Sequence, residues 1–337
     1  MDTVTLFVYR YPSACITFSL LLKRVAKMNY ELSKKIHLSF VLVTKRWLME
    51  YIDAKTIIRK CTPNRNYLSF DYAMDIYRGC SHGCIYCYAR SNYYEKTDNF
   101  DCVRAKRDAL QIIRDELRRM ERTGVVLMGG VSDSYNPKEK ELRLARNALE
   151  LINAFQFGVC IITKSNLVTR DTDILLDIKE HSPASVNFSI TCSDDETCKK
   201  LEPFVATTKE RFEAIEHLTK NGITTGVLMD PMIPYITDTK ENVQEMVKKA
   251  KHYGANYIYL STQVTMADVQ RDYFLQEAEK HYPGISEKFL QRYKNYYRCW
   301  SYNGKKLWNT FVEACEKERI SYDMRAVNQM LRCGYNY

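Results

Sequence analysis

Short apolar runs alternate with longer amphipathic segments between residues 74 and 261. The apolar runs predict strands at Met74–Tyr77, Val125–Met128, Val159–Thr163, Val186–Thr191, Thr225–Met229 and Tyr257–Ser261. The segments between them predict helices at Asp101–Arg122, Lys138–Phe155, Asp171–Glu180, Lys209–Asn221 and Lys240–Tyr253. Gly222 and Gly254 stand where the C-caps of two of these helices belong, directly before a strand.

Six strand–helix alternations predict an α/β fold with a parallel sheet and right-handed crossovers. We expect a partial (β/α)6 TIM-type barrel over residues 49–265, with a doubly wound open sheet as the alternative. Residues 266–337 are predicted to be helices rich in Tyr, Lys and Arg. We expect them to form a helical accessory region that closes the open side of the barrel.

The first 48 residues differ from the rest in charge and pattern. They hold eight Lys or Arg and two acidic residues, so they carry +6 of the net charge of +9 and leave only +3 for residues 49–337. This weakens the electrostatic case for a nucleic-acid partner. The apolar run Tyr11–Leu22 is too short to span a bilayer and lacks the preceding basic region of a secretion signal. We expect the native chain to start at Met49, with a peripheral membrane anchor in residues 1–48 as the alternative.

Three cysteines stand close together in the run Tyr77-Arg-Gly-Cys-Ser-His-Gly-Cys-Ile-Tyr-Cys-Tyr-Ala-Arg90, at Cys80, Cys84 and Cys87. Thiolates are the usual ligands of iron–sulfur clusters, and three thiolates leave one iron of a four-iron cluster open. A structural zinc site is the alternative, but His82 lies too close to the cysteines to complete a regular tetrahedron. Twelve irregularly spaced cysteines do not indicate a disulfide framework, and iron-binding thiols must stay reduced. We therefore expect a cytoplasmic protein without stable membrane insertion.

The C-x3-C-x2-C spacing, with aromatic Tyr86 before the last cysteine, resembles the radical S-adenosylmethionine (SAM) superfamily. The wider run resembles its spore photoproduct lyase-related branch, often labelled DNA repair photolyase, and the resemblance covers roughly residues 50 to 290. It implies one [4Fe-4S] cluster, bound SAM and reductive cleavage of SAM to a 5′-deoxyadenosyl radical. It also implies an electron donor such as flavodoxin or ferredoxin, and we expect the enzyme to be a monomer.

The end of the second predicted strand offers groups for the methionyl part of SAM, because ligands gather at the C-terminal ends of parallel strands. Gly129 and Gly130 let backbone carbonyls approach an ammonium group closely. This segment resembles the one that holds the methionyl amine in the superfamily. Ser132 and Asp133 are the side chains expected nearest the cofactor, and an ordinary strand–helix turn is the alternative.

The resemblance assigns further cofactor contacts to the following strands. Lys164 matches a lysine that contacts the cofactor in related lyases, and Ser189 matches a serine near the ribose. Tyr86 and the stiff loop Asp230–Asp238 are expected on the adenine side. Arg170 could contact the SAM carboxylate or form a salt bridge at a helix start.

At one position that bears on the substrate, the sequence departs from the pattern of the photoproduct lyases. The photoproduct lyases return a hydrogen atom from a cysteine two residues before the cofactor serine; if that serine is Ser132, the cysteine is replaced here by Gly130. Thymine-dimer repair by that route is therefore not expected. Nucleic acid stays the preferred substrate class, a small molecule or peptide is the alternative, and a non-catalytic metal-binding module is a further one. A second cluster is not expected; among the other cysteines only Cys192 and Cys198 are close in sequence.

Overall fold

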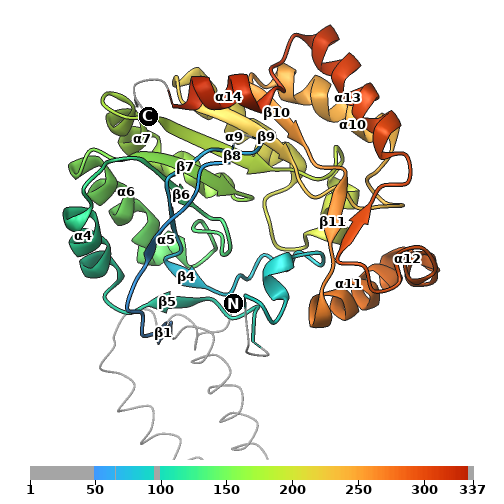
Figure 1. Ribbon diagram of the computed structural model, residues 1–337, viewed down its shortest axis with the longest axis horizontal. Helices are drawn as coiled ribbons and strands as arrows, with labels where there is room; N and C mark the ends of the chain where they lie inside the picture. Colours follow the sequence, from blue (N-terminus) through green and yellow to red (C-terminus); the bar gives the residue numbers. More distant parts are fainter. Residues whose placement is uncertain (1–48, 65, 95–98, 333–337) are drawn as a thin grey trace, which may run out of the picture. The chain divides into compact units, whose positions relative to one another are not determined.

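The computed structural model describes residues 49–64, 66–94 and 99–332, and one seven-stranded sheet runs through them (Figure 1). The described residues from Tyr51 onward belong to one compact unit. The extension predicted at residues 1–48 lies outside the described residues.

The sheet holds six parallel strands and one antiparallel edge strand, in the order β10-β9-β8-β7-β6-β3-β2. The strands are β2 (Ile58–Lys60), β3 (Tyr72–Met74), β6 (Val125–Met128), β7 (Gly158–Thr163), β8 (Ala184–Ser189), β9 (Thr224–Met229) and β10 (Tyr257–Leu260). The parallel strands follow one another in chain order, without the reversal that defines a doubly wound sheet. The sheet is not closed, since β10 and β2 are its two edges. The predicted α/β partial barrel is confirmed.

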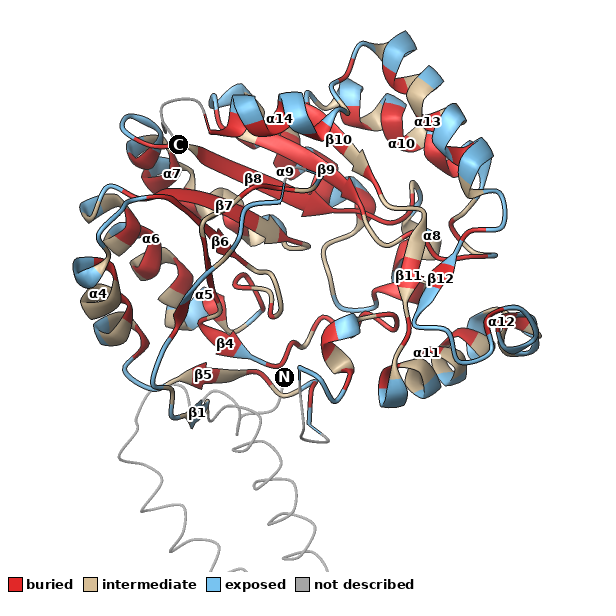
Figure 2. Ribbon diagram, in the orientation of Figure 1, coloured by how far each residue is buried: buried red, intermediate tan, exposed pale blue. Residues whose placement is uncertain are grey.

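The parallel strands are buried along most of their length, as Figure 2 shows. Every residue of β6 and β8 is buried. Such continuous burial is typical of a parallel sheet covered on both faces, and it explains why apolar runs rather than alternating patterns revealed these strands. Five of the six predicted strands lie within two residues of their observed limits.

The first predicted strand, Met74–Tyr77, is wrong in its limits. β3 ends at Met74, and the chain leaves the sheet at Asp75, whose carboxylate accepts a hydrogen bond from the Val131 amide (3.3 Å). Tyr77 then belongs to a separate three-stranded sheet, which consists of β1 (Glu50–Ile52), β5 (Arg104–Lys106) and β4 (Tyr77–Arg78). A polar residue inside the apolar run therefore separates two strands that the sequence pattern joined.

Most predicted helices lie where expected. They are α7 (Thr172–Lys179), α9 (Thr208–Lys220) and α10 (Lys240–His252). The predicted helix Asp101–Arg122 is wrong at its start, because the strand β5 (Arg104–Lys106) lies in that range and α4 (Ala109–Arg119) begins only after it. Gly222 and Gly254 follow the C-cap residues of α9 and α10 with φ of +83° and +82°, so the predicted glycine caps are confirmed.

The predicted helix Lys138–Phe155 is two helices, α5 (Glu139–Leu142) and α6 (Leu144–Ala154). Arg143 between them has a φ of +51°. The buried Glu139 carboxylate accepts a hydrogen bond from the Ala145 amide (3.0 Å), which satisfies a free N–H at the start of α6. The short helix α8 (Asp195–Leu201) was not predicted; Asp194 caps it by accepting from the Thr197 amide (2.7 Å).

The C-terminal region is mainly helical, as predicted. Its helices are α11 (Asp268–His281), α12 (Ile285–Tyr293), α13 (Gly304–Glu318) and α14 (Met324–Leu331), and α13 packs against α10. The strand β12 (Arg298–Trp300) was not predicted and pairs with β11 (Gln263–Thr265) in an antiparallel ladder. None of the helices in the described ranges is both long enough and apolar enough to cross a membrane.

Helix α14 ties together the N-terminal ends of the outermost parallel strands. Ser321, just before α14, pairs with Tyr257 at the start of β10. At its other end, Asn328 accepts from the Ser69 amide (2.9 Å) and donates to the Tyr67 carbonyl (2.7 Å), close to the start of β3. Arg332 follows with an ion pair to Asp71 (2.8 Å). At the N-terminal ends of the strands, the helix therefore bridges the open side of the sheet between β10 and β3.

Candidate active site around the three-cysteine loop

The three cysteines lie on the loop between β4 and the short 3-10 helix η1 (Tyr88–Arg90). Two glycines shape this loop. Gly79 has a φ of +75°, and a Cβ there would lie 2.3 Å from the Cys102 carbonyl oxygen. Gly83 has a φ of +69°, and a Cβ there would lie 2.7 Å from the Phe204 ring. Glycine suits the positive φ at both positions, and at Gly79 the close backbone also leaves no room for a Cβ.

The thiols differ in their electrostatic surroundings. Cys80 and Cys84 are buried and Cys87 is partly buried. Burial raises the pKa of Cys84 well above its usual value and that of Cys87 to about 11. Burial would also raise the pKa of Cys80, but the neighbouring His82 imidazole outweighs it and lowers that pKa.

His82 is itself held in an unusual state. It is buried, and its Nδ1 lies 3.4 Å from a carboxylate oxygen of Asp133. Burial favours the neutral ring, but the charges of Cys80 and Asp133 outweigh this and raise the pKa of His82 to about 9. His82 thus places a positive charge beside the first cysteine.

The donor set fits a multi-iron cluster. Cys80 and Cys87 both act electrostatically on Cys84, so the three thiols share one neighbourhood. Within the described part of the chain, no three His, Cys, Asp or Glu side chains are arranged to hold a single metal ion. Three thiols on one loop are the ligands that a four-iron cluster with one open iron requires.

The end of β6 lies directly against the cysteine loop. Ser132 Oγ donates to the Gly79 carbonyl (2.9 Å), and the Tyr88 hydroxyl donates to the Gly130 carbonyl. Gly129 has a φ of +86°, and a Cβ there would lie 2.0 Å from the Ile162 carbonyl oxygen, so only glycine allows the ends of β6 and β7 to approach so closely. Gly129, Gly130 and Ser132 therefore lie beside the loop, as expected; their contacts to SAM stay predictions.

Asp133 joins three segments of the site. Its carboxylate accepts from Thr163 Oγ1 (2.9 Å), from the Lys164 amide (2.9 Å) and from the Tyr135 amide (2.8 Å), besides facing His82. The structure thus gives Asp133 a bridging role between the cysteine loop and the end of β7.

Lys164 and Ser189 meet although they leave different strands. Lys164 Nζ donates to Ser189 Oγ (2.5 Å), and Ser189 Oγ donates to the Asp230 carbonyl (3.0 Å). The Lys164 ammonium lies 5.7 Å from the centre of the Tyr86 ring. Three residues assigned to cofactor contacts therefore converge beside the cysteine loop.

A buried ion pair at this point was missed by the sequence analysis. Glu202 and Arg211 have fully buried side chains, and Arg211 Nη2 lies 2.5 Å from Glu202 Oε2. Burial would raise the pKa of Glu202, but Arg211 and Lys164 outweigh it and lower that pKa to about 2. The signal that could have revealed Arg211 is its place on the apolar stripe of α9, with Ile215 and Leu218 four and seven residues further on.

Arg170 lies where the alternative interpretation placed it. Arg170 forms ion pairs with Asp171 (2.8 Å) and Glu139 (2.9 Å), which is the salt bridge at a helix start rather than a contact to the cofactor residues. Cys192 and Cys198 are both buried, and Arg211 Nη2 donates to Cys198 Sγ (2.9 Å).

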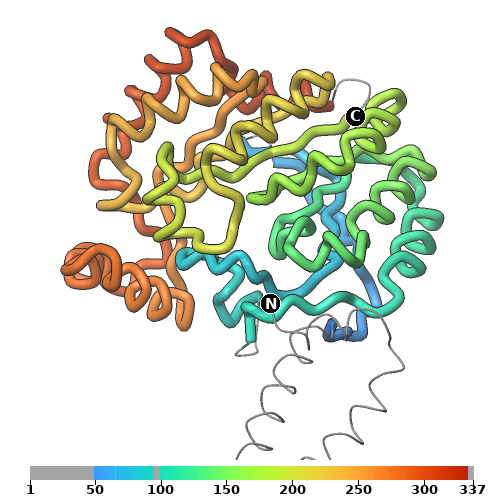
Figure 3. The backbone as a smooth tube through the Cα atoms, turned by 180° about the vertical axis from the view of Figure 1, so that it is seen from behind, coloured from blue at the N-terminus to red at the C-terminus, as the bar shows by residue number. Residues whose placement is uncertain are grey.

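The C-terminal helices support the cysteine loop, as Figure 3 shows from behind. Cys84, Ile85 and Tyr86 share a hydrophobic core with α11 and α12, including Phe274 and Phe289. Gln270 of α11 donates to the Tyr86 carbonyl (3.0 Å). The cysteine loop is thus held from both sides, by β6 and by α11.

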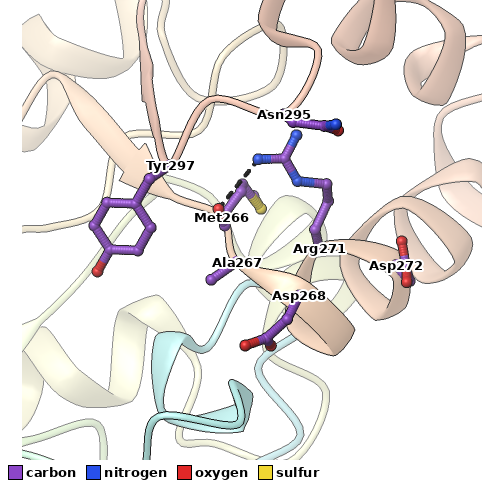
Figure 4. Close-up of a pocket in the computed structure, with 7 residues that line it drawn as sticks. All are labelled: Met266, Ala267, Asp268, Arg271, Asp272, Asn295 and Tyr297. Carbon is purple, nitrogen blue, oxygen red and sulfur yellow. Dashed lines mark hydrogen bonds between the residues drawn. The ribbon is translucent and has the colours of Figure 1, made fainter.

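A separate pocket of about 390 Å³ lies at the start of α11 (Figure 4). It is lined by Met266, Ala267, Asp268, Arg271, Asp272, Asn295 and Tyr297. The Arg271 guanidinium donates to the carbonyls of Met266 (3.2 Å), Lys294 and Tyr296 (2.5 Å). Its charge is thus used within the fold, and the pocket holds none of the predicted site residues.

Comparison with known proteins agrees with this geometry. The sequence model of the family described as the radical SAM superfamily matches residues 74–250. An uncharacterised protein of Mycobacterium tuberculosis is 27% identical over 238 residues, which cover 69% of this chain and 70% of that protein. One of Methanocaldococcus jannaschii is 29% identical over 219 residues, covering 64% and 80%. The spore photoproduct lyase of Clostridium acetobutylicum is 24% identical over 197 residues, covering 56% and 53%.

Among solved structures, spore photoproduct lyase complexed with dinucleoside spore photoproduct is similar in fold. The TM-score is 0.57 at 16% identity, over 81% of this chain and 80% of that one. A mutant of that lyase with bound AdoMet gives a TM-score of 0.58 at 15% identity over the same shares. These likenesses concern the fold.

Proposed function

Because the chain belongs to the radical SAM superfamily, we propose that its three-cysteine loop holds one [4Fe-4S] cluster and that the strand ends beside it bind SAM. Cys80, Cys84 and Cys87 are the proposed cluster ligands. The observation that carries the proposal is the convergence of Tyr86, Lys164 and Ser189 next to these thiols. Cluster and cofactor together supply one-electron cleavage of a carbon–sulfur bond of SAM.

The chain's own residues would bind and orient the cofactor. The Lys164 ammonium has three N–H donors; one is given to Ser189, and the ammonium forms an ion pair with Glu202 (3.6 Å), so a donor is left for a carboxylate oxygen. The carbonyls of Gly129 and Gly130 are the proposed acceptors for the amine, with Ser132 and Asp133 next to them. Tyr86 is proposed on the adenine side and Ser189 at the ribose.

Anaerobic reconstitution with iron and sulfide tests the cluster. We expect about four irons per chain and a broad visible absorption. Cys80→Ala, Cys84→Ala and Cys87→Ala should each abolish both, whereas the buried Cys315→Ala in α13 should keep them. A colourless, zinc-loaded wild-type protein would contradict the proposal.

With dithionite, wild type should form 5′-deoxyadenosine, and Lys164→Ala or Ser189→Ala should weaken SAM binding without loss of colour.

For the substrate we propose nucleic acid. The support is a surface of exposed aromatic side chains on the segment around β12, at Tyr296, Tyr297, Trp300 and Tyr302. The Arg292 guanidinium lies 4.6 Å from the centre of the Tyr302 ring. Exposed aromatic rings next to cations suit unpaired bases, which stack on them. A small molecule or peptide stays the alternative, and Gly130 still argues against repair by the thiol-dependent route.

We also propose an electron donor, an oligomeric state and a cellular compartment for the enzyme. A flavodoxin or ferredoxin would supply the electron, and the enzyme would work as a monomer in the cytoplasm, where thiols stay reduced.

A further inference from the structure

Glu202 lies at a fixed place beside the cysteine loop. The Ile85 amide donates to the Leu201 carbonyl (3.0 Å), and the Phe204 amide donates to the His82 carbonyl (3.2 Å). Backbone hydrogen bonds on both sides of Glu202 therefore connect its segment to the loop. The position of its carboxylate relative to the cysteines is set by the backbone and not by a flexible side chain alone.

The two oxygens of Glu202 face opposite ways. Oε1 accepts from the Tyr86 hydroxyl, lies 3.6 Å from Lys164 Nζ and accepts from Thr191 Oγ1 (3.4 Å). Oε2 pairs with Arg211 (2.5 Å) and lies 3.7 Å from Cys198 Sγ. One oxygen thus serves the proposed cofactor residues, while the other is anchored in the core.

Arg211 completes the arrangement. Its Nη1 donates to the Ser189 carbonyl (2.6 Å), on the residue whose hydroxyl accepts from Lys164. Tyr86, Lys164 and Ser189 come from three distant segments, yet each contacts the Glu202–Arg211 pair directly. An ion pair with no exposed surface costs desolvation, so it is weak evidence for stability, and its contacts with these three residues favour a positional role.

We propose that the Glu202–Arg211 pair is the positioning element of the cofactor site, which orients the Lys164 ammonium and the Tyr86 hydroxyl for SAM. This rests on the proposed function, because it assigns a role toward the same cofactor. Without Glu202, Lys164 loses its anionic partner and Tyr86 loses its acceptor, so both side chains can turn away from the loop. For metal ligands, loss of an outer partner typically costs about 10- to 100-fold in affinity or activity, and we expect an effect of that size on SAM binding.

The test uses a double substitution, because Glu202→Gln alone would leave a buried, unpaired Arg211 and endanger folding. Glu202→Gln combined with Arg211→Met removes both charges at similar volume. The matched control is Asp71→Asn with Arg332→Met, which removes another mostly buried ion pair at the opposite ends of the strands. Tyr86→Phe is a milder variant that removes only one hydroxyl.

Each reconstituted protein is titrated with SAM by equilibrium dialysis, and the electron paramagnetic resonance spectrum of its reduced cluster is recorded at each SAM concentration. We expect the Glu202/Arg211 double variant to bind as much iron as the control variant and to melt at about the same temperature. Its Kd for SAM should rise about 10-fold or more, and Tyr86→Phe should give a smaller rise. The spectral change on SAM binding should saturate at correspondingly higher concentration.

The outcomes separate the two levels of the proposal. An unchanged SAM Kd in the folded double variant overturns the positioning role. Loss of iron or of folding in the double variant, together with a wild-type Kd for Tyr86→Phe, also overturns it, because the pair would then be purely structural. A wild-type protein that holds no cluster or binds no SAM contradicts the proposed function itself.

Discussion

At the scale of single residues, Tyr86, Lys164 and Ser189 each contact the buried Glu202–Arg211 pair. The cysteines, Lys164 and Ser189 stand out because their types and spacing are unusual at strand ends. Glu202 and Arg211 do not, because their importance comes from mutual burial, which depends on how two distant parts of the chain pack. A buried ion pair is a property of the tertiary structure, and only the charged residue on the apolar stripe of α9 gives a local sign of it.

Gly79 allows a sharp prediction at this scale. Gly79→Ala should destabilise the cysteine loop, because a left-handed backbone costs an L-residue about 1–2 kcal/mol and the added Cβ would also collide with a backbone carbonyl at 2.3 Å. We expect reduced iron occupancy after reconstitution, measured by iron analysis and visible absorption.

The matched control for Gly79→Ala is Gly284→Ala. Gly284 has a φ of +81°, but a Cβ there meets nothing within 4 Å, so it carries the backbone cost without the collision. Gly284→Ala should keep full iron loading. Equal iron occupancy in the two variants would show that the close approach at Gly79 is unimportant for the loop.

At the scale of elements, prediction succeeded where burial is continuous. The apolar runs of β6 to β10 are buried on both faces, so each stands out from its polar surroundings. Prediction failed where elements are short, or where contacts with residues distant in sequence decide where an element ends. The break at Arg143 depends on the Glu139 side chain, and β12 exists because it pairs with β11.

Helix α14 offers a test at this scale. Asn328→Ala removes the partner of the Ser69 amide and of the Tyr67 carbonyl, and leaving buried polar groups unpaired costs about 1–3 kcal/mol. We expect the free energy of unfolding to fall by that amount in urea titrations. Met330→Ala on the exposed side of the same helix should change it by less than about 0.5 kcal/mol. Equal effects of the two substitutions would show that the hydrogen bonds of Asn328 do not stabilise the fold.

At the scale of the whole molecule, charge is divided unevenly along the chain. Residues 49–337 carry only +3, so any binding of nucleic acid has to rely on few phosphate contacts and on stacking. The overall fold class could be predicted from the order of strands and helices, because sequential parallel strands allow few topologies. The substrate could not, because it depends on surface side chains whose neighbours are set by the folded chain.

The small net charge and the exposed aromatic side chains predict how nucleic acid would bind. A fluorescent oligothymidylate should bind residues 49–337 with a modest salt dependence, about two in the slope of log K against log salt if about three phosphates are contacted. Trp300→Ala and Tyr302→Ala should each weaken binding, since a stacked base contributes about 1–3 kcal/mol. Fluorescence anisotropy at about 50 and 200 mM salt measures both effects.

Trp308→Ala is the control for these aromatic substitutions, because Trp308 is also exposed but lies on α13. It should bind like wild type. Deuterium transfer from a labelled oligonucleotide into 5′-deoxyadenosine would then identify a substrate rather than a mere ligand. Negligible binding at both salt concentrations would remove nucleic acid from consideration and favour a small molecule or peptide.

The tie between α14 and the start of β3 also bears on how the polypeptide reaches its native state. Asn328 is synthesised 259 residues after Ser69, to which it is hydrogen-bonded. Contacts between such distant positions close a long loop and slow folding. We expect a chain still on the ribosome to hold its first strands without this support, with a strand edge open to wrong pairing. Assembly of the sheet would therefore be completed only after α14 has been synthesised, so the folding of this late helix would govern the yield of soluble protein.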